Sequence, residues 1–282
     1  MTVVIDGKQL AKQIRVGIKE EVESLKQKGI SPKLAVVMVG EDKASKVYVK
    51  NKSKACNEVG IHYEEILLPT DTTKEALLQT IEELNQRPDI HGILLQSPIP
   101  AHLDIYEAFE TIDFRKDVDG FHPINIGRLT LNRQTFISCT PHGIMKMLEA
   151  YQISLKGANV VIIGRSNIVG KPLAQCLLNQ DATVTICHSK TKQIEEITKK
   201  ADIVIVAIGK PNFLTEDMIK PGAVVIDVGI NRLETGLVGD VDFEKVSQKA
   251  GYITPVPGGV GPMTIAMLLQ NVVIAAKYLE DK

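Results

Sequence analysis

The sequence has 282 residues, 44% of them hydrophobic, and its 33 basic and 34 acidic side chains leave a formal net charge of −1. This length predicts two domains or one large one, and the mixed charges exclude the basic footprint of a nucleic-acid-binding protein. The apolar runs are shorter than the ~20 residues that span a bilayer, and the N-terminus lacks the residue order of a signal peptide. We therefore expect a cytoplasmic protein that binds neither membrane nor nucleic acid.

The cysteines and histidines do not suggest a metal centre. The four cysteines are scattered without C-x-x-C spacing, at Cys56, Cys139, Cys176 and Cys187, and the six histidines are dispersed. This pattern is typical of free thiols in a reducing compartment. We expect no metal site.

The first half of the chain alternates predicted helices and strands. A helix follows Asp6-Gly7 and ends before Gly29, because its apolar residues recur on one face. After the apolar strand "KLAVVMVG" we predict a helix from about Ala44 to Glu58, the strand "YEEILLP", the helix "KEALLQTIEELNQ" and the strand "IHGILL". Such alternation predicts a parallel sheet with right-handed crossovers.

The middle of the chain, from Pro98 to Thr140, has no long periodic segment and is rich in Pro, Gly and Asp. We expect loops and short helices there that lead to a domain junction. The following "TPHGIMKMLEAY" predicts a helix with Thr140 as the N-cap and Pro141 at its first position.

A second alternating series begins at Asn159. The strands "NVVIIG", "TVTICH", "DIVIVAIG" and "AVVIDVG" and the helices "VGKPLAQCLLNQ" and "KQIEEITKKA" predict a Rossmann-type domain. The last helix, "IAMLLQNVVIAAKYL", is apolar on more than one face, so it should pack between the domains or return to the first one. The predicted fold is α/β with two domains: an N-terminal three-layer α/β domain, residues 1–139 with the C-terminal helix 265–282, and a Rossmann-type domain, residues 140–264.

The turn "GRSNIVGKP" resembles a dinucleotide fingerprint in which the middle glycine is replaced. A buried strand ends at Gly164, a helix begins near Val169, and a helix N-terminus attracts phosphate. Ser166 is small and its hydroxyl can donate to phosphate, and Arg165 adds positive charge. An ordinary strand-to-helix connection is the alternative interpretation.

The end of the next strand indicates which nucleotide is bound. NAD-binding folds usually carry an acidic residue there for the ribose diol, but "CHSKTK" supplies His188, Ser189, Lys190 and Lys192 instead. Ser and basic residues accept an additional phosphate, which favours NADP over NAD. An incidental polar loop is the alternative.

Polar residues also gather in the predicted first domain. Tyr48 and Lys52 are four residues apart and so share a helix face, although a solvated lysine beside a packed tyrosine has the same spacing. Gln96 follows a buried strand at the carboxyl end, where ligand crevices lie in α/β sheets. In "KDVDGFH", Asp117 and Asp119 are natural turn residues, and one carboxylate could accept hydrogen bonds from an amino-substituted heterocycle. The late loop "PVPGGVGPMT" is rich in glycine and so permits close ligand approach.

Together these segments resemble one family, the bifunctional methylenetetrahydrofolate dehydrogenases/methenyltetrahydrofolate cyclohydrolases in their short bacterial form. The resemblance covers essentially the whole chain through an ordered set of motifs: "ASKVYVKNKSKAC", "GILLQSPIP", "KDVDGFHPINIGRL", "CTPHGIM", "GRSNIVGKP", "CHSKT" and "PGGVGPMT". Ser97 stands where the family commonly has Leu, which alters a contact facing the pterin.

The resemblance implies an enzyme of one-carbon metabolism and purine biosynthesis that oxidises 5,10-methylenetetrahydrofolate with NADP and hydrolyses the product to 10-formyltetrahydrofolate in the same cleft. Lys52 would be the cyclohydrolase lysine, with Tyr48 beside it and Gln96 orienting it, and Asp119 would hold the pterin.

The resemblance also implies binding residues for the two substrates. Those bordering the folate and nicotinamide would include Pro257, Gly258 and Gly259. Those at the NADP site would be Gly164, Arg165, Ser166, Gly170, His188, Ser189 and Ile230. It further implies a homodimer joined through the nucleotide-binding domains, and folate substrates with or without a polyglutamate tail.

Two other functions also fit parts of the sequence. Another two-domain NADP dehydrogenase, acting on a hydroxy or amino acid, would need a carbonyl-polarising base and would lack cyclohydrolase activity. A non-catalytic NADP sensor would bind the nucleotide without turnover. The polar residues Tyr48, Lys52, Gln96 and Asp119 favour catalysis, because they come from separate segments that have no structural need of them.

Overall fold

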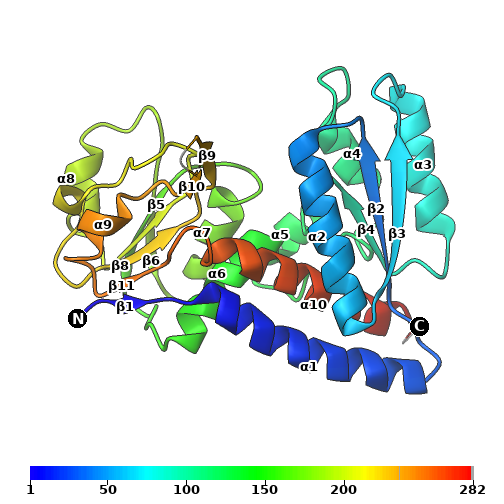
Figure 1. The fold of residues 1–282 in the computed structure, drawn as a ribbon, viewed down its shortest axis with the longest axis horizontal. Helices are drawn as coiled ribbons and strands as arrows, with labels where there is room; N and C mark the ends of the chain where they lie inside the picture. Colours follow the sequence, from blue (N-terminus) through cyan, green and yellow to red (C-terminus); the bar gives the residue numbers. More distant parts are fainter. Residues whose placement is uncertain (235, 281–282) are drawn as a thin grey trace. The chain divides into compact units, whose positions relative to one another are not determined.

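The chain forms two compact α/β units in a computed structural model that describes residues 1–234 and 236–280, with residues 43 and 44 by their backbone alone (Figure 1). Unit 1 comprises residues 1–12 and 138–264, and unit 2 comprises residues 13–137 and 265–280. The predicted fold class, two α/β parts with a C-terminal helix that returns to the first, is confirmed.

Unit 2 is built on a three-stranded parallel sheet. Its elements in chain order are α1 (Gly7–Gln27, which begins in unit 1), β2 (Lys33–Val39), α2 (Lys43–Val59), β3 (His62–Leu68), α3 (Lys74–Gln86), β4 (Gly92–Leu95), α4 (Ile105–Thr111), α5 (Pro123–Thr130) and α10 (Val260–Glu280, which also begins in unit 1). The strand order is β3-β2-β4, so β2 is central and its last six residues are buried.

Helices cover both faces of this sheet. Apolar side chains of α3 and α4, among them Leu77, Ile81 and Phe109, pack on one face, and α2 lies over the other (Figure 1). The Asp42 carboxylate caps α2 by accepting from the Ser45 amide, and left-handed Gly60 ends the helix. The two caps thus set where α2 begins and ends, and so which of its residues lie near the carboxyl ends of the strands.

Unit 1 contains a six-stranded parallel sheet of the Rossmann type. Its sheet strands are β1 (Val3–Val4), β5 (Asn159–Ile163), β6 (Thr183–Cys187), β7 (Ile203–Val206), β8 (Val224–Asp227) and β11 (Tyr252–Ile253), in the order β1-β11-β8-β7-β5-β6. The remaining elements are the helices α6 (Cys139–Ala150), α7 (Gly170–Leu178), α8 (Ile194–Thr198), α9 (Phe243–Val246) and the 3-10 helix η1 (Glu216–Met218), and the hairpin β9 (Asn231–Leu233) with β10 (Gly236–Val238).

Three details differ from the sequence-based expectations. Residues 1–12 belong to unit 1, because β1 pairs with β11. The N-cap of α6 is Ser138, whereas the Thr140 hydroxyl lies 3.0 Å from that of Thr264. Helix α8 has only five residues, because Gln193 before it takes left-handed angles that a longer helix could not contain.

The helix α10 is long and apolar enough to cross a membrane by length and composition. However, 61% of its apolar window is buried within the protein, as in the core helix of a globular domain. Near its end, Lys277 forms an ion pair of 2.6 Å with Glu21 of α1. This apolar helix is thus accounted for by packing within the chain.

Candidate active site

Lys52 and Gln96 are joined by a hydrogen bond in unit 2. The Lys52 ammonium donates to Gln96 Oε1 at 2.9 Å, and Gln96 Nε2 donates to the Ser97 carbonyl oxygen at 2.7 Å. Lys52 lies in α2 and Gln96 directly follows β4, whose last residue pairs with β2. Gln96 is only 8% exposed, so its amide is fixed at both ends and presents one oxygen to the lysine.

Two other residues of α2 lie one turn from Lys52. Tyr48 shares its face, as predicted, and is 43% exposed, so it can meet a ligand. Cys56 lies one turn after Lys52, towards the C-terminal end of α2, and is fully buried. Burial raises the pKa of its thiol to about 12, although the positive charge of Lys52 acts in the opposite direction. The thiol is therefore neutral and inert at neutral pH, as the sequence predicted for the cysteines.

The two aspartates of the loop "KDVDGFH" differ in burial and in hydrogen bonding. Asp117 is 2% exposed and accepts hydrogen bonds from the backbone amides of Gly120, Phe121 and His122 and from Asn125 Nδ2. Burial raises the pKa of its carboxyl group. Asp117 therefore holds the loop together.

Asp119 lies two residues further on and is half-buried. Its neighbour Val118 is anchored from α10, because Asn271 Nδ2 donates to the Val118 carbonyl oxygen at 2.8 Å. On the other side, the Lys116 ammonium donates to the carbonyl oxygens of Asn85 at 2.9 Å and Arg87 at 2.7 Å, at the end of α3. Asp119 is thus carried by a loop that is fixed on both sides.

Sequence reasoning missed these anchors. Nothing in the spacing of Lys116, Asn125 and Asn271 indicates that they meet one loop. The one available signal was the occurrence of Lys, Asn and Asp in segments otherwise predicted to be apolar or short.

The nucleotide-type turn of unit 1 is folded tightly at two glycines. Gly164 has φ +130°, and a methyl group there would collide with the Ala207 carbonyl oxygen. A methyl group on Gly170 would collide with the Gly164 carbonyl oxygen. Both positions therefore require glycine, and the turn can fold tightly before α7.

The side chain of Ser166 binds two of the backbone amides at the start of α7 that would otherwise be free to bind an anion. Its hydroxyl oxygen accepts from the amides of Val169 at 3.2 Å and Gly170 at 3.4 Å, so these two helix N-terminal donors are partly occupied. The hydroxyl hydrogen takes no part in these two bonds and can donate to an anion. Arg165 beside it is exposed.

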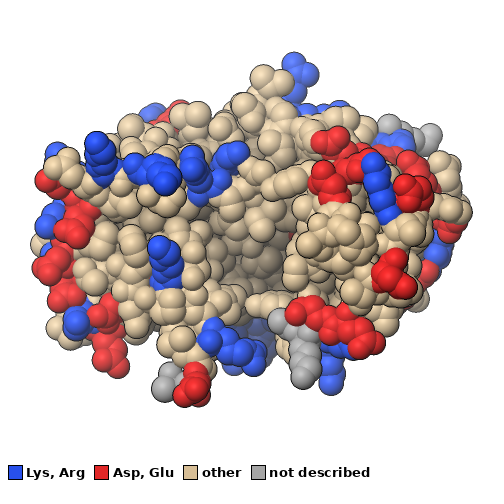
Figure 2. Space-filling view, turned by 90° about the horizontal axis from the view of Figure 1, so that it is seen from above, with Lys and Arg blue, Asp and Glu red and all other residues tan. Residues whose placement is uncertain are grey.

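The loop after β6 is ordered by its own side chains. The Thr191 hydroxyl accepts from the His188 amide at 2.9 Å, and His188 Nδ1 accepts from the Lys190 amide at 3.2 Å. Ser189, Lys190 and Lys192 are exposed. On the face drawn in Figure 2, Lys and Arg side chains form a row across the upper part of the left half, whereas Asp and Glu side chains line most of its left edge.

The glycine-rich loop is also in unit 1. Gly258 has φ +108°, and its carbonyl oxygen accepts from the Lys8 amide at 2.9 Å. Gly259 follows, and Pro257 precedes it. Ile230 is 48% exposed and lies near Gly261. The structure therefore places Ile230 beside the start of α10, at the end of the same loop.

Two buried carboxylates fix the neighbouring loops and were not predicted. Asp240 accepts from the amides of Ile208 and Gly209 at 2.8 and 2.9 Å, and Asp227 accepts from the amides of Gly229 and Val241 at 2.9 and 3.0 Å. Burial raises the pKa of Asp227 to about 6, and the nearby Asp240 charge acts in the same direction. Together these acids brace the loop that carries Ile230.

Comparison with known proteins decides the family. The model described as "Tetrahydrofolate dehydrogenase/cyclohydrolase, catalytic domain" matches residues 5–119, and the model of the NAD(P)-binding domain of the same name matches residues 138–280. The chain belongs to the tetrahydrofolate dehydrogenase/cyclohydrolase family. The resemblance predicted from the sequence is confirmed.

Similar members of the tetrahydrofolate dehydrogenase/cyclohydrolase family cover nearly the whole chain. The bifunctional protein FolD of Nautilia profundicola is 57% identical over 97% of each chain. The FolD structure from Campylobacter jejuni is 53% identical, with a TM-score of 0.98 over 99% of each chain. The FolD structure from Trypanosoma brucei, solved with NADP cofactor and an inhibitor, is 40% identical, with a TM-score of 0.94 over 98% of each chain.

The two family matches divide the candidate residues between them. The catalytic-domain match holds Tyr48, Lys52, Gln96 and Asp119, and the NAD(P)-binding match holds the turn at Gly164 and the loop at Ser189. No group of three or more His, Cys, Asp and Glu side chains suited to a metal ion occurs among residues 1–234 and 236–280.

Proposed function

We propose that this chain performs both reactions named by its family in sequence: NADP-dependent oxidation of 5,10-methylenetetrahydrofolate to 5,10-methenyltetrahydrofolate, and hydrolysis of that product to 10-formyltetrahydrofolate. The observation that supports the assignment of residues is the 2.9 Å bond from Lys52 to Gln96. It ties a proton-carrying side chain to a buried amide at the carboxyl edge of a parallel sheet, where α/β proteins bind ligands.

The hydride step requires alignment more than proton transfer. The adjacent nitrogen lone pair of the folate stabilises the cation that forms, so no strong protein base is needed. NADP supplies the hydride acceptor when bound. The chain's part is to hold the two ring systems face to face, with Pro257, Gly258, Gly259 and Ile230 beside the nicotinamide and folate.

The turn of unit 1 fits the phosphates of NADP. Gly164 and Gly170 allow the turn to fold tightly before α7, Ser166 offers a hydroxyl, and Arg165 offers charge. His188 and Ser189 follow β6 without an acidic neighbour, in the position where a 2′-phosphate would otherwise be repelled.

The hydrolytic step moves protons. Water adds to the cationic methenyl carbon and releases one proton. The hydroxyl so formed then gives up its own proton as one carbon–nitrogen bond breaks, and that nitrogen takes up a proton. Lys52 can hold and return a proton at this carbon, with Gln96 fixing its Nζ and Tyr48 beside it. Asp119 accepts hydrogen bonds from the amino-substituted pterin, with or without a polyglutamate tail on the substrate.

We further propose a homodimer joined through the nucleotide-binding units. Strand β6 is at the edge of the unit 1 sheet and its exposed residues alternate. An open edge of this kind can pair with the same edge of a second copy. Sedimentation equilibrium should give twice the chain mass.

The balanced charge and the largely buried α10 support a cytoplasmic protein without membrane or nucleic-acid partners.

The test of the whole assignment is to assay methylenetetrahydrofolate oxidation with NADP and with NAD at equal concentrations. We expect faster turnover with NADP. Ser189→Asp should reverse or remove this preference, because the new carboxylate repels the 2′-phosphate, while Gln248→Asp, a change at an exposed position after α9 and away from β6, should not. Faster wild-type turnover with NAD would refute the nucleotide assignment.

A further inference from the structure

A cavity of unit 2 lies apart from the candidate active-site residues. It has a volume of about 510 Å³ and is lined by Phe114, Asn125 and Arg128 on one side and by Ile274, Lys277 and Tyr278 of α10 on the other. None of Tyr48, Lys52, Gln96 and Asp119 lines it. The volume falls within the range of small-molecule sites.

The cavity offers aromatic and apolar surface. Ile274 and Tyr278 of α10 are 39% and 40% exposed. The guanidinium carbon of Arg128 lies 4.8 Å from the centre of the Phe114 ring. A planar ring entering the cavity can therefore contact aromatic side chains and a flat cation at once.

The charged side chains of the lining are all basic: Arg115, Arg128 and Lys277. Arg115 is held by Asp113, and Lys277 by Glu21. Among the residues that the structure describes, no carboxylate lies within ion-pair distance of Arg128. Its N–H donors are thus available to an anion in a fixed, ring-stacked orientation.

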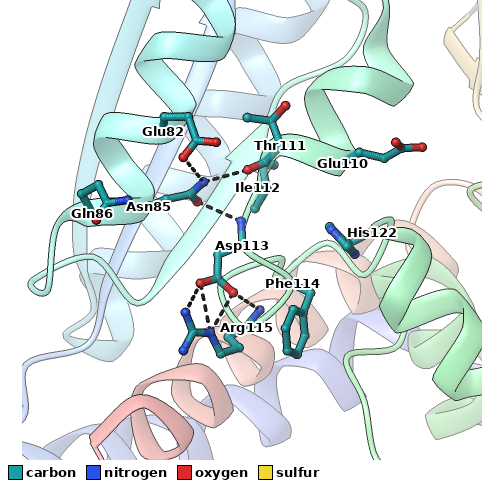
Figure 3. Close-up of a pocket in the computed structure, with 10 residues that line it drawn as sticks. All are labelled: Glu82, Asn85, Gln86, Glu110, Thr111, Ile112, Asp113, Phe114, Arg115 and His122. Carbon is teal, nitrogen blue, oxygen red and sulfur yellow. Dashed lines mark hydrogen bonds and ion pairs between the residues drawn. The ribbon is translucent and has the colours of Figure 1, made fainter.

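A neighbouring cavity provides a contrast within the same unit. It is about 470 Å³ and shares Phe114 and Arg115 with the first, but its lining includes Glu82 and Glu110 (Figure 3). Figure 3 shows the Arg115 guanidinium turned to the Asp113 carboxylate. Anionic ligands would be repelled from this acidic cavity and attracted to the basic, aromatic one.

We propose that the cavity between Phe114, Arg128 and α10 binds a flat aromatic anion, a one- or two-ring compound that carries a carboxylate, sulfonate or phosphate. The ring packs against Ile274 and Tyr278, and the anionic group accepts charge-assisted hydrogen bonds from Arg128. This site is separate from the folate and NADP residues and does not depend on their assignment.

The test uses naphthalene-1-sulfonate as the probe, titrated into the full chain by calorimetry. We expect one saturable site per chain. Arg128→Gln should weaken binding roughly tenfold, because the amide keeps some length and planarity but loses the charge. The matched change Arg133→Gln, on an exposed arginine five residues away that does not line the cavity, should leave the affinity unchanged.

Two further measurements separate recognition of the anionic group from apolar binding and from loss of the fold. Neutral 1-naphthalenemethanol should bind wild type and Arg128→Gln equally weakly, and Arg128→Lys should recover part of the sulfonate affinity. Dehydrogenase activity and thermal unfolding of the Arg128 variants should match wild type. Equal weakening by the Arg128 and Arg133 changes, loss of binding when NADP and 10-formyltetrahydrofolate are saturating, or no saturable binding would each overturn the proposal.

Discussion

Lys52 and Tyr48 share one face of α2, yet only Lys52 is tied to a second element of the sheet through Gln96. This asymmetry assigns different tasks to the two side chains. A tethered ammonium has a defined position at which to give and take a proton, whereas an exposed phenol ring is better suited to packing against a substrate ring.

Lys52→Met should therefore separate the two reactions. The thioether keeps much of the side-chain length but carries no proton, so cyclohydrolase activity should fall by about 10²- to 10⁴-fold. Dehydrogenase activity should persist, since hydride transfer needs alignment only. The two steps can be followed by NADPH formation and by loss of methenyltetrahydrofolate absorbance.

The matched control is Lys54→Met on the exposed side of the same helix, which should alter neither step. Equal loss of both activities in Lys52→Met would mean that the lysine only binds substrate. Unchanged activities would make it a solvated helix lysine.

The two aspartates of the 117–119 segment should behave differently when replaced. Asp119→Ala removes a partner of the pterin, so folate affinity should fall about tenfold or more while NADP affinity is kept. Fluorescence or calorimetric titration of each ligand measures this. Asp117→Ala instead leaves three backbone amides and Asn125 without their acceptor, and should lower the free energy of unfolding. Unchanged folate affinity in Asp119→Ala would return that residue to a turn-forming role.

At the scale of elements, the two ends of the strands in the unit 2 sheet carry different side chains. Gln96 lies at the carboxyl end of β4. Near the amino ends of β2 and β4, by contrast, Glu64 of β3 accepts from both Arg87 nitrogens at 2.6 and 2.9 Å and pairs with Lys33 at 2.6 Å. Ion pairs thus tie the strands together away from the candidate site.

This cluster gives a pH-dependent contribution to stability. The Arg87 and Lys33 charges lower the pKa of Glu64 to about 2 from its ordinary value near 4.5. Stability from this carboxylate is therefore present above pH ~4.5 and is lost as the pH falls towards 2. Glu64→Gln should cost about 1–2 kcal/mol at pH 7, allowing for solvent screening, and should flatten the dependence of unfolding free energy on pH between 4.5 and 2.

Urea unfolding at several pH values measures this effect, with Glu65→Gln as the control. Glu65 is exposed and has no ion pair among those described in the structure. An identical acid profile for wild type and Glu64→Gln would contradict the assigned contribution.

Local sequence patterns predicted most helices and strands well, but they predicted the contacts between distant segments poorly. The range of α3 and the strands β2 to β8 followed from apolar runs and flanking Gly, because these signals are local, whereas β1 and β11 were not predicted. The bond from Lys52 to Gln96 spans 44 residues and was expected only through the family resemblance. Thr140 was wrongly expected to cap α6, because Ser138 two residues earlier is equally suited by composition. The pairing of β1 with β11 could not be read from a two-residue strand.

At the scale of the whole molecule, α10 supports the Asp119 loop from the far end of the chain. Asn271, 1% exposed, donates to the carbonyl oxygens of Val118 at 2.8 Å and Ile137 at 3.2 Å. Asn271→Leu should remove both hydrogen bonds, lower the unfolding free energy by about 1–3 kcal/mol and raise the KM for methylenetetrahydrofolate.

The neighbouring Gln270→Leu is a matched control. The Gln270 side-chain oxygen is buried and has no hydrogen-bond partner among the described residues, so its removal should cost little. Denaturant unfolding and steady-state kinetics compare the two. Equal effects of both changes would show that the Asn271 bonds contribute nothing specific.

The path of the chain between the units sets the order in which the enzyme can be made. Unit 2 begins at residue 13, is interrupted at 137 by nearly all of unit 1, and resumes only at 265. The hydrogen bond from Asn271 to the Val118 carbonyl oxygen can therefore form only after about 150 further residues have been translated. Their translation takes roughly 10–30 s at typical ribosome speeds. During that time the loop bearing Asp119 lacks its anchor. The nascent chain should thus acquire its nucleotide site before its folate site. A stalled chain in which Thr264 has left the ribosome tunnel while the following residues are still inside it would display the first site without the second.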